Sequence, residues 1–164
     1  MLVIGVDVGL LHTALAVIEE GAVGRRCTIN VEGDTEDVGP RFVKLREGLE
    51  TVSKRVLKGI APAVISIEQP ELGIRKGHDA GSVLKLYGAF AVCYAECARL
   101  WPKAHVMGVL ADTVRKPLRA GIMRAKYRVE CPNSHVWDAI WQADLAWDIA
   151  RARAREAERA SENA

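Results

Sequence analysis

The order of its short apolar runs constrains this chain more than any other feature of its sequence. Residues 2–8, 13–19 and 25–31 are rich in β-branched and aliphatic side chains, and short glycine-containing turns separate them. This pattern predicts three antiparallel strands. Apolar residues then recur at helical spacing over residues 41–58, and residues 63–68 return to a strand pattern. A helical crossover of this length allows the fourth strand to lie parallel beside the first.

The second half of the chain continues the alternation of helices and strands. A glycine-rich, charged loop over residues 70–81 leads into an apolar helix over residues 82–100, and residues 104–109 form a predicted fifth strand. We expect the last helix to begin at Asn133 or Ser134, because either side chain can cap its first turn.

Length and composition limit the chain to one ordinary domain. It has 164 residues, 49% of them hydrophobic, and 23 basic residues nearly balance 21 acidic ones. These values are typical of a globular domain with an aliphatic core. We therefore predict an α/β fold with a five-stranded mixed β-sheet flanked by α-helices over residues 1–150. A charged tail over residues 151–164 is expected to be a solvated, fraying helix end.

Targeting and redox features suggest a cytoplasmic protein. The longest stretch without a charged residue, 8–18, is half of the roughly 20 residues that a membrane-spanning helix needs. The N-terminus shows no basic leader and no small-residue cleavage site. Cys27, Cys93, Cys97 and Cys131 lack CxxC spacing, so we expect small buried hydrophobic residues in a reducing compartment.

Two carboxylates stand at the ends of predicted strands. Asp7 interrupts an apolar run, and Glu68 ends the run Ala-Val-Ile-Ser-Ile-Glu. Taken singly, each is more simply interpreted as a strand-end carboxylate that faces water. If the two strands are neighbours, however, the carboxylates lie side by side, where like charges repel unless a cation separates them. Together they indicate a metal site.

His135 and Asp138 are three residues apart on the predicted last helix and therefore share one face. That face could complete a hard-cation site begun by the strands. Taken alone, the pair is more simply a surface histidine and an aspartate in the first helical turn, where negative charge suits the helix dipole. Cys131 and His135 could also begin a zinc site, although no second pair of ligands is visible.

Four short motifs follow one another at characteristic spacing. They are Ile-Gly-Val-Asp-Val-Gly at the start, Ser-Ile-Glu-Gln in the fourth predicted strand, a Lys-Leu pair in the next helix, and His-x-x-Asp-Ala near the end. In this order the chain resembles, up to about Ile149, the RuvC family of Holliday-junction resolvases, within the RNase H-like, retroviral-integrase superfamily. The resemblance implies an RNase H-like fold and a crossover junction endodeoxyribonuclease that cuts branched DNA.

The resemblance also implies a set of catalytic, metal-binding residues. In the family, the first strand contributes an aspartate, the fourth a glutamate, and the last helix two ligands three residues apart. These positions correspond to Asp7, Glu68, His135 and Asp138, and family members have either aspartate or histidine at the position of His135. Two Mg²⁺ ions per site, replaceable by Mn²⁺, would be held with Asp7 between them. Such a pair can activate a water and stabilise the departing 3′-oxygen of a phosphodiester. His135 would coordinate an ion, orient the water or act as a base.

Basic residues are concentrated near the predicted site. The segment 112–130 carries six cations against two acidic residues, whereas residues 134–150 contain aspartates but no Lys or Arg. We expect the cations of this segment to contact DNA phosphates. The same is expected of Arg75 and Lys76, which lie close to Glu68 in the sequence, and of Lys85, which matches a family lysine close to DNA. The predicted DNA-binding residues are Arg75, Lys76, Lys85, Arg115, Lys116, Arg119, Arg124, Lys126 and Arg128. Taken singly, each of these residues could instead be a solvated surface charge with no role in DNA binding.

The sequence departs from the family at one position. RuvC proteins typically carry an aromatic wedge shortly after the catalytic glutamate, and residues 69–74 contain no aromatic side chain. We therefore expect weak sequence preference. The segment 112–130 is also shorter and more irregular than is usual in the family, which favours a divergent, phage-encoded member as an expectation. Trp137, Trp141 and Trp147 lie at helical spacing and are expected to pack rather than stack on bases.

Symmetric cutting of a junction requires two active sites, so we expect a homodimer. The predicted interface is the helix over residues 82–100, where small side chains permit close approach: Gly88, Ala89, Ala91, Ala95 and Ala98. Burial of this helix within its own domain is the alternative.

Two other functions stay open. A YqgF-type nuclease shares the Asp-x-Gly opening but acts in ribosomal RNA maturation and lacks the His-x-x-Asp-Ala ending. The second alternative is a protein that binds junctions without cutting them. The presence of potential metal ligands at all four positions argues against it.

Overall fold

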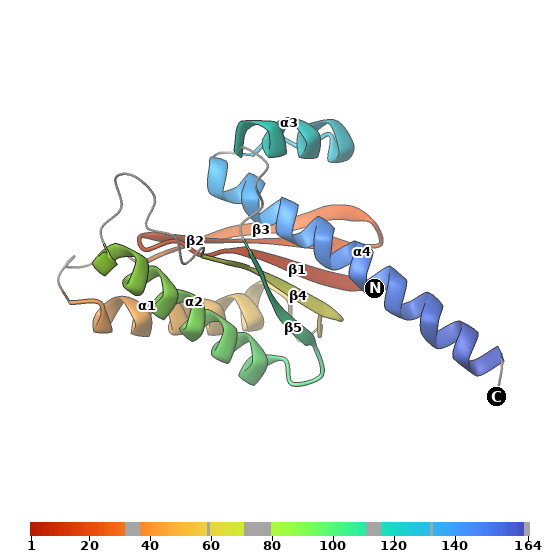
Figure 1. Cartoon of the computed structure of the whole chain (residues 1–164), viewed down its shortest axis with the longest axis horizontal. Coiled ribbons are helices and arrows are strands. Elements are labelled where there is room, and N and C mark those ends of the chain that lie inside the picture. Colours follow the sequence, from red (N-terminus) through yellow and green to blue (C-terminus); the bar gives the residue numbers. More distant parts are fainter. Residues whose placement is uncertain (32–36, 59, 71–79, 111–115, 132, 163–164) are drawn as a thin grey trace.

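The predicted strands assemble into one mixed sheet in the computed structural model, which describes residues 1–31, 37–58, 60–70, 80–110, 116–131 and 133–162. Within these ranges the strand order is β3-β2-β1-β4-β5 (Figure 1). The elements are β1 (Leu2–Asp7), β2 (His12–Glu19), β3 (Ala22–Asn30), α1 (Gly39–Thr51), the π-helical turn η1 (Val52–Val56), β4 (Val64–Gln69), α2 (Ala80–Leu100), β5 (His105–Leu110), α3 (Lys116–Tyr127) and α4 (Ser134–Glu162). The α/β fold with a five-stranded mixed sheet and flanking helices is confirmed.

β1 lies at the centre of the sheet and pairs in two directions. It is antiparallel to β2 and parallel to β4, with Val6 opposite Ile67, as the helical crossover predicted. β5 is in turn parallel to β4. β3 begins at Ala22 rather than residue 25, because Glu20 and Gly21 both adopt positive φ and form a two-residue hairpin turn.

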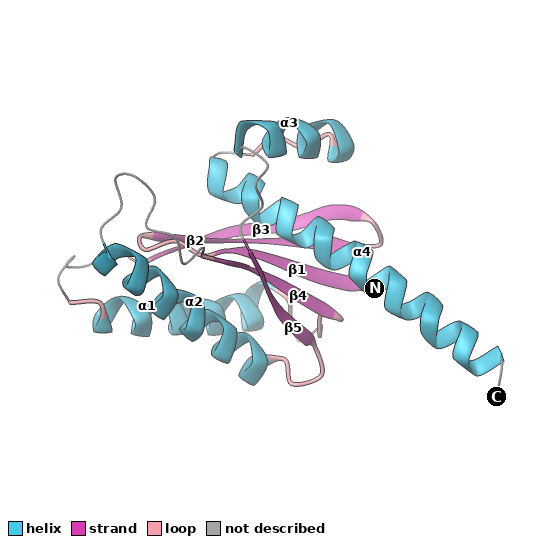
Figure 2. Ribbon diagram, viewed as in Figure 1, coloured by secondary structure: helices cyan, strands magenta, loops and turns pink. Residues whose placement is uncertain are grey.

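Alternation along β1 separates two layers of the core. Leu2, Ile4 and Val6 point into the layer covered by α1 and α2, whereas Val3 packs in the layer covered by α4. Figure 2 shows α1 and α2 on one face of the sheet and α4 on the other. The side chain of Asp7 therefore belongs to the α4 face, since side chains two residues apart share a face.

The helices differ from expectation at three places. The helix predicted over residues 41–58 begins at Gly39 and ends in the π-helical turn. The basic segment, which gave no clear element from sequence, contains α3, and this helix rests on α4 away from the sheet (Figure 1). α4 begins as predicted, because Asn133 Oδ1 accepts a hydrogen bond from the Val136 amide at 3.0 Å.

The last turns of α4 extend beyond the sheet. Ala150 is buried, and residues 151–162 are exposed and helical to Glu162 (Figure 1). The division of the chain at residue 150 stays a prediction. None of the helices in the described ranges is long and apolar enough to span a membrane.

The cysteines follow the expectation in part. Cys93 and Cys97 are buried on α2 with free thiols, whereas Cys27 and Cys131 are half-buried. Trp137 is buried in the core layer under α4, and Trp141 and Trp147 pack against that layer, as predicted from their spacing.

Candidate metal and nuclease site

Parallel pairing places the two strand-end carboxylates next to each other. Val6 of β1 lies opposite Ile67 of β4, so the following residues, Asp7 and Glu68, are neighbours at the same edge of the sheet. The Ser66 hydroxyl donates a hydrogen bond to Gln142 of α4 at 2.7 Å, so the side chain of Ser66 points to the face of the sheet that α4 covers. Glu68, two residues further along the strand, shares that face with Asp7.

Gly5 allows α4 to approach the sheet closely enough to add the third carboxylate. A Cβ atom at Gly5 would lie 2.0 Å from the Ala143 amide nitrogen and 2.1 Å from the Ala139 carbonyl oxygen. The helix backbone therefore lies directly on β1, and the preceding turn of α4 holds Asp138 over the strand end. The side chain of Asp138 is 1% exposed.

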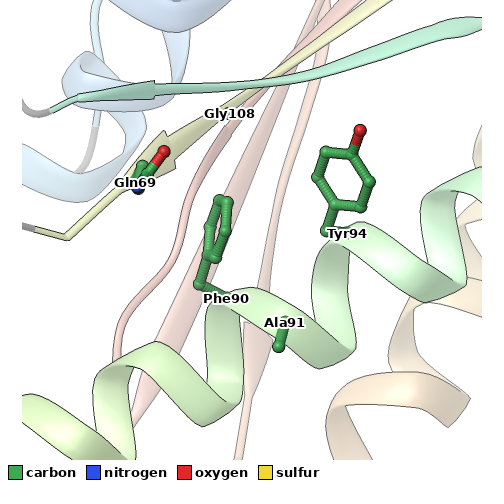
Figure 3. A pocket seen from close by; sticks show the side chains of 5 residues that line it. All are labelled: Gln69, Phe90, Ala91, Tyr94 and Gly108. Atoms are coloured by element: carbon green, nitrogen blue, oxygen red, sulfur yellow. The ribbon is translucent and has the colours of Figure 1, made fainter.

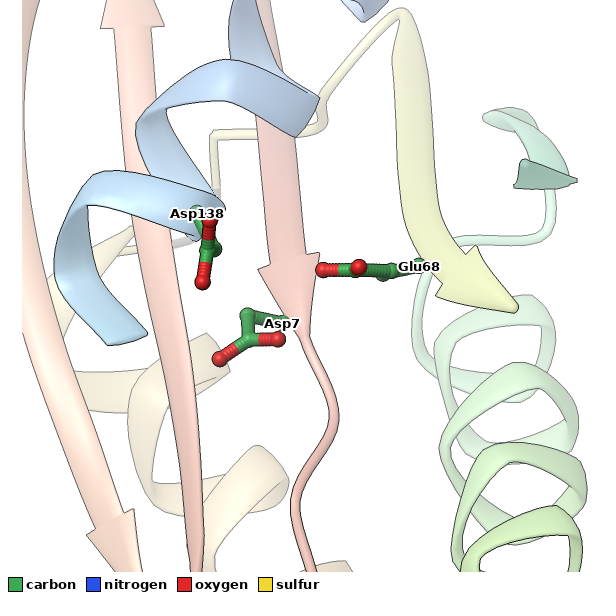
Figure 4. A group of neighbouring side chains, drawn as sticks. All are labelled: Asp7, Glu68 and Asp138. Carbon is green, nitrogen blue, oxygen red and sulfur yellow. The ribbon is translucent and has the colours of Figure 1, made fainter. Parts of the chain in front are cut away.

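Asp7, Glu68 and Asp138 form one cluster (Figure 4). Each offers a carboxylate oxygen, and these three oxygens lie within 4.8 Å of one another. Among the described residues no other such cluster of potential metal ligands is found, and Cys131 is not part of it, so the zinc alternative is not supported. Glu68 Oε2 is buried and accepts no hydrogen bond from the described residues. Buried, oxygen-only donors of this kind fit Mg²⁺ or Mn²⁺.

Like charges at close range perturb the titration of this cluster. Burial and the neighbouring Asp7 raise the pKa of Glu68 from 4.5 to about 7, and Asp138 acts in the same direction. The Arg119 guanidinium opposes this shift. A divalent cation bound between the carboxylates would offset this repulsion and favour the ionised form of Glu68.

His135 contacts the cluster through Asp7. Its Nδ1 lies 2.6 Å from Asp7 Oδ2, and its side chain is 37% exposed, so the imidazole borders the solvent side of the site. The His12 ring, at the start of β2, lies 6.2 Å from the His135 ring, and His12 Nδ1 lies 3.0 Å from Asn30 Oδ1. Sequence reasoning did not include His12, since a single histidine before a strand carries no distinctive signal.

Arg119 lies inside the site rather than among the surface cations with which we grouped it. Its side chain is 3% exposed, and Nη1 lies 3.4 Å from Asp138 Oδ1 and 3.6 Å from Glu68 Oε1. Arg119 precedes the buried Met123 by four residues and therefore shares its face of α3. The sequence alone carried no signal that separated Arg119 from the other cations of its segment.

The other predicted DNA-binding residues lie in several environments. On α3, Arg124 is 59% exposed, 3.7 Å from Glu130, and lies over the Trp137 ring, whereas Lys126 bonds Asp144 at 2.6 Å. Arg128 is exposed just after α3, and Lys85 is half-buried on α2. Arg75, Lys76, Arg115 and the side chain of Lys116 lie outside the described residues. The contacts of all these residues with DNA stay predictions.

The comparisons with known proteins bear on the fold. No family model matches the chain, and no curated protein matches its sequence. The sheet order, the flanking helices and the position of the carboxylates at the ends of β1 and β4 define an RNase H-like fold.

The particular version of this fold is RuvC-like. The structure of RuvC from Thermus thermophilus matches with a TM-score of 0.60 and 19% identity, over 87% of this chain and 91% of that one. The T. thermophilus RuvC in complex with a Holliday junction substrate matches with a TM-score of 0.61 and 20% identity, over 87% of this chain and 90% of that one.

Proposed function

We propose that this chain is a Mg²⁺-dependent endodeoxyribonuclease that cuts Holliday junctions and other branched DNA. The observation that carries the proposal is the cluster of buried carboxylates, Asp7, Glu68 and Asp138, on a RuvC-like fold. Three acidic side chains gathered within 4.8 Å are costly without cations, so the arrangement is understandable as a binding site for them. The match to a RuvC bound to a Holliday junction supports the substrate class.

The three carboxylates and His135 have distinct places in this proposal. Asp7, Glu68 and Asp138 would hold two divalent ions, which when bound supply an activated water and stabilise the leaving 3′-oxygen of a phosphodiester. His135 Nδ1, when protonated, donates a hydrogen bond to Asp7 Oδ2 and fixes the orientation of that carboxylate. Because its imidazole is partly exposed, His135 also faces the side from which a phosphate would enter.

α3 supplies the proposed contacts to the DNA backbone. The helix rests on α4, whose first turns carry His135 and Asp138, so its exposed cations lie on the side of the sheet that holds the carboxylates. Arg124 and Arg128 are the exposed residues that would contact phosphates on the arms of a junction.

We propose that the active form is a homodimer through the outer face of α2. Gly88 and Ala89, which we expected at the interface, instead pack within the domain: a Cβ at Gly88 would lie 2.7 Å from the Phe42 ring, and Ala89 is 3% exposed. Ala91, Ala95 and Ala98 are exposed.

The surface around these alanines favours a second copy of the chain as the partner. Leu84 is 71% and Tyr94 38% exposed on the same helix. Tyr94 also borders a hollow of about 410 Å³ between α2, the end of β4 and β5, which is lined by Gln69, Phe90, Ala91, Tyr94 and Gly108 (Figure 3). An apolar, concave surface of this kind suits an isologous contact, which also supplies the two sites that paired cuts need.

A substrate panel tests the function. The purified chain is incubated with four-way, three-way, flap and linear DNA duplexes, and with a structured RNA precursor, in Mg²⁺, in Mn²⁺ and in chelator. We expect metal-dependent cuts near the branch points of several DNA substrates and weak sequence dependence. Cleavage of the RNA alone would favour the RNA-processing alternative, and binding of junctions without cleavage in either metal would favour the non-catalytic one.

A further inference from the structure

One buried cation shares the carboxylate cluster. α3 carries Arg119 into the site, where its guanidinium lies 3.4 Å from Asp138 and 3.6 Å from Glu68. With the three carboxylates ionised, the site holds three negative charges and one positive charge. Arg119 therefore offsets part of the repulsion that a metal ion would otherwise have to offset entirely.

The contacts of Arg119 are electrostatic rather than closely hydrogen-bonded. Its Nε and Nη1 atoms are buried and make no hydrogen bond to the described residues. Its distances to the carboxylate oxygens exceed the 2.7–3.2 Å usual for N–H···O bonds. The two carboxylates therefore attract the guanidinium mainly through its charge, and a divalent cation at the same oxygens would repel it.

We infer that Arg119 is an internal counter-cation that stabilises the metal-free site and competes with divalent ions for Glu68 and Asp138. The inference rests on the proposed function, because it assumes that the cluster binds metal. It adds a property that the carboxylates alone do not have: the affinity of the site for metal is set partly by a residue that is not a ligand.

Competition predicts two effects of opposite sign when the charge of Arg119 is removed. The metal-free protein loses the partner of two buried carboxylates and becomes less stable. The metal-binding affinity rises, since the bound ion no longer faces a positive charge a few ångströms away. A residue with a merely structural role would lower both stability and metal affinity when replaced.

The test is Mn²⁺ binding to the full chain without DNA, followed by the electron paramagnetic resonance signal of the free ion. We expect Arg119→Met to bind Mn²⁺ at least about tenfold more tightly than the wild type, the order expected for a unit charge and a divalent ion at close range even in water. Its urea midpoint without metal should be lower. Arg119→Lys, which retains the charge, should bind Mn²⁺ like the wild type.

The matched control is Arg124→Met, which removes the same charge from the exposed side of the same helix and should change Mn²⁺ affinity by less than about twofold. If Arg119→Met does not fold, Arg119→Gln makes the same comparison. Mn²⁺ binding to Arg119→Met or Arg119→Gln that is no tighter than to the wild type, while Asp138→Asn loses binding, would overturn the inference and leave the proposed function intact. Equal Mn²⁺ binding by the wild type and Asp138→Asn would instead remove the metal site, and with it the proposed function.

Discussion

Asp7, Glu68 and Asp138 bring three ionisable groups into a largely buried space where water screens their charges poorly. The cluster is tolerated because each carboxylate has a neighbour that reduces its cost: His135 for Asp7, and Arg119 for Glu68 and Asp138. These contacts leave a net negative site in the metal-free protein. The residues that would bind metal are therefore also a source of instability when metal is absent.

The titration of Glu68 makes this cost measurable. Its pKa is raised from 4.5 to about 7, so between these values the folded chain holds a proton that the unfolded chain has released. The contribution of Glu68 to stability is fully present below pH 4.5 and is lost as the pH rises to about 7. We expect the urea midpoint of the metal-free wild type to fall more across this range than that of Glu68→Gln, which cannot titrate. The same pH dependence in both proteins would contradict the assignment.

The sequence predicted the three carboxylates of this cluster better than their neighbours. Asp7 and Glu68 could be placed together because both end neighbouring strands, and Asp138 joined them only through the order of motifs shared with the RuvC family. The position of Arg119 could not be predicted, because a cation in a basic segment gives the same local signal whether its helix turns it toward solvent or toward a buried cluster. The direction in which Arg119 points depends on how α3 packs on α4, and this packing involves residues far apart in the sequence.

At the scale of elements, the close contact between α4 and β1 determines the geometry of the site. Gly5→Ala should push the helix away from the strand, because the new Cβ would lie 2.0 Å from the Ala143 backbone. We expect a loss of at least about 1–3 kcal/mol in the free energy of unfolding, as for overpacked cores. Mn²⁺ affinity should fall as well, since Asp138 moves with the helix.

Gly24→Ala is the matched control for this substitution. Gly24 lies in β3, and its nearest neighbour for a new Cβ is the Val17 carbonyl oxygen at an ordinary 3.8 Å. Urea denaturation and Mn²⁺ titration of both variants make the comparison. A Gly5→Ala protein as stable as Gly24→Ala, with wild-type metal affinity, would show that the close approach does not position Asp138.

The exposed cations on and just after α3 allow phosphate contacts to be separated from ion pairs within the protein. If Arg124 and Arg128 contact phosphates, replacing each with glutamine should reduce the slope of log affinity against log salt by about 0.9 for a junction with duplex arms. Lys126→Gln should reduce it less, because Lys126 is already paired with Asp144. The measurement is junction binding at several salt concentrations. An unchanged slope in the double variant would place the DNA on another surface.

Helices and strands could be predicted where the residues that determine their ends lie within the element or next to it. β1, β2, β4 and β5 lie within a residue or two of their predicted positions, because each is an apolar run with clear ends. β3 begins early because Glu20 adopts a positive φ in the turn before it. Glycine is the residue that usually indicates such a conformation, and this position has none. The π-helical end of α1 likewise has no sequence signature that periodicity detects.

At the scale of the whole molecule, the pairing of β4 with β1 was predictable because a helical crossover of this length allows two strands to pair in parallel. The assembly was less so: Gly88 and Ala89 looked like interface residues but are used to pack α2 within its own domain. Small residues permit close packing without specifying whether the partner is the same chain or another.

The remaining outer face of α2 supports a specific prediction about assembly. Light scattering at micromolar concentration should give about twice the 17.9 kDa mass of the chain. Ala91→Glu should shift the mass toward the monomer, because it places a charge in the apolar contact. A wild-type monomer that still cuts both strands of a junction symmetrically would contradict the dimer.

The measurement that tests the central claim most directly is single-turnover cleavage of a four-way DNA junction by the wild type and by Asp138→Asn, at concentrations where both are fully bound. We predict paired cuts by the wild type that need Mg²⁺ and stop in chelator. Asp138→Asn should cleave more than about a hundredfold more slowly, since loss of a ligand exceeds the usual effect of losing a residue that only supports one. Its junction binding should be unchanged or tighter, because a negative charge near the phosphates is gone. Cleavage by Asp138→Asn at the wild-type rate, or wild-type cleavage that persists without divalent metal, would contradict the account.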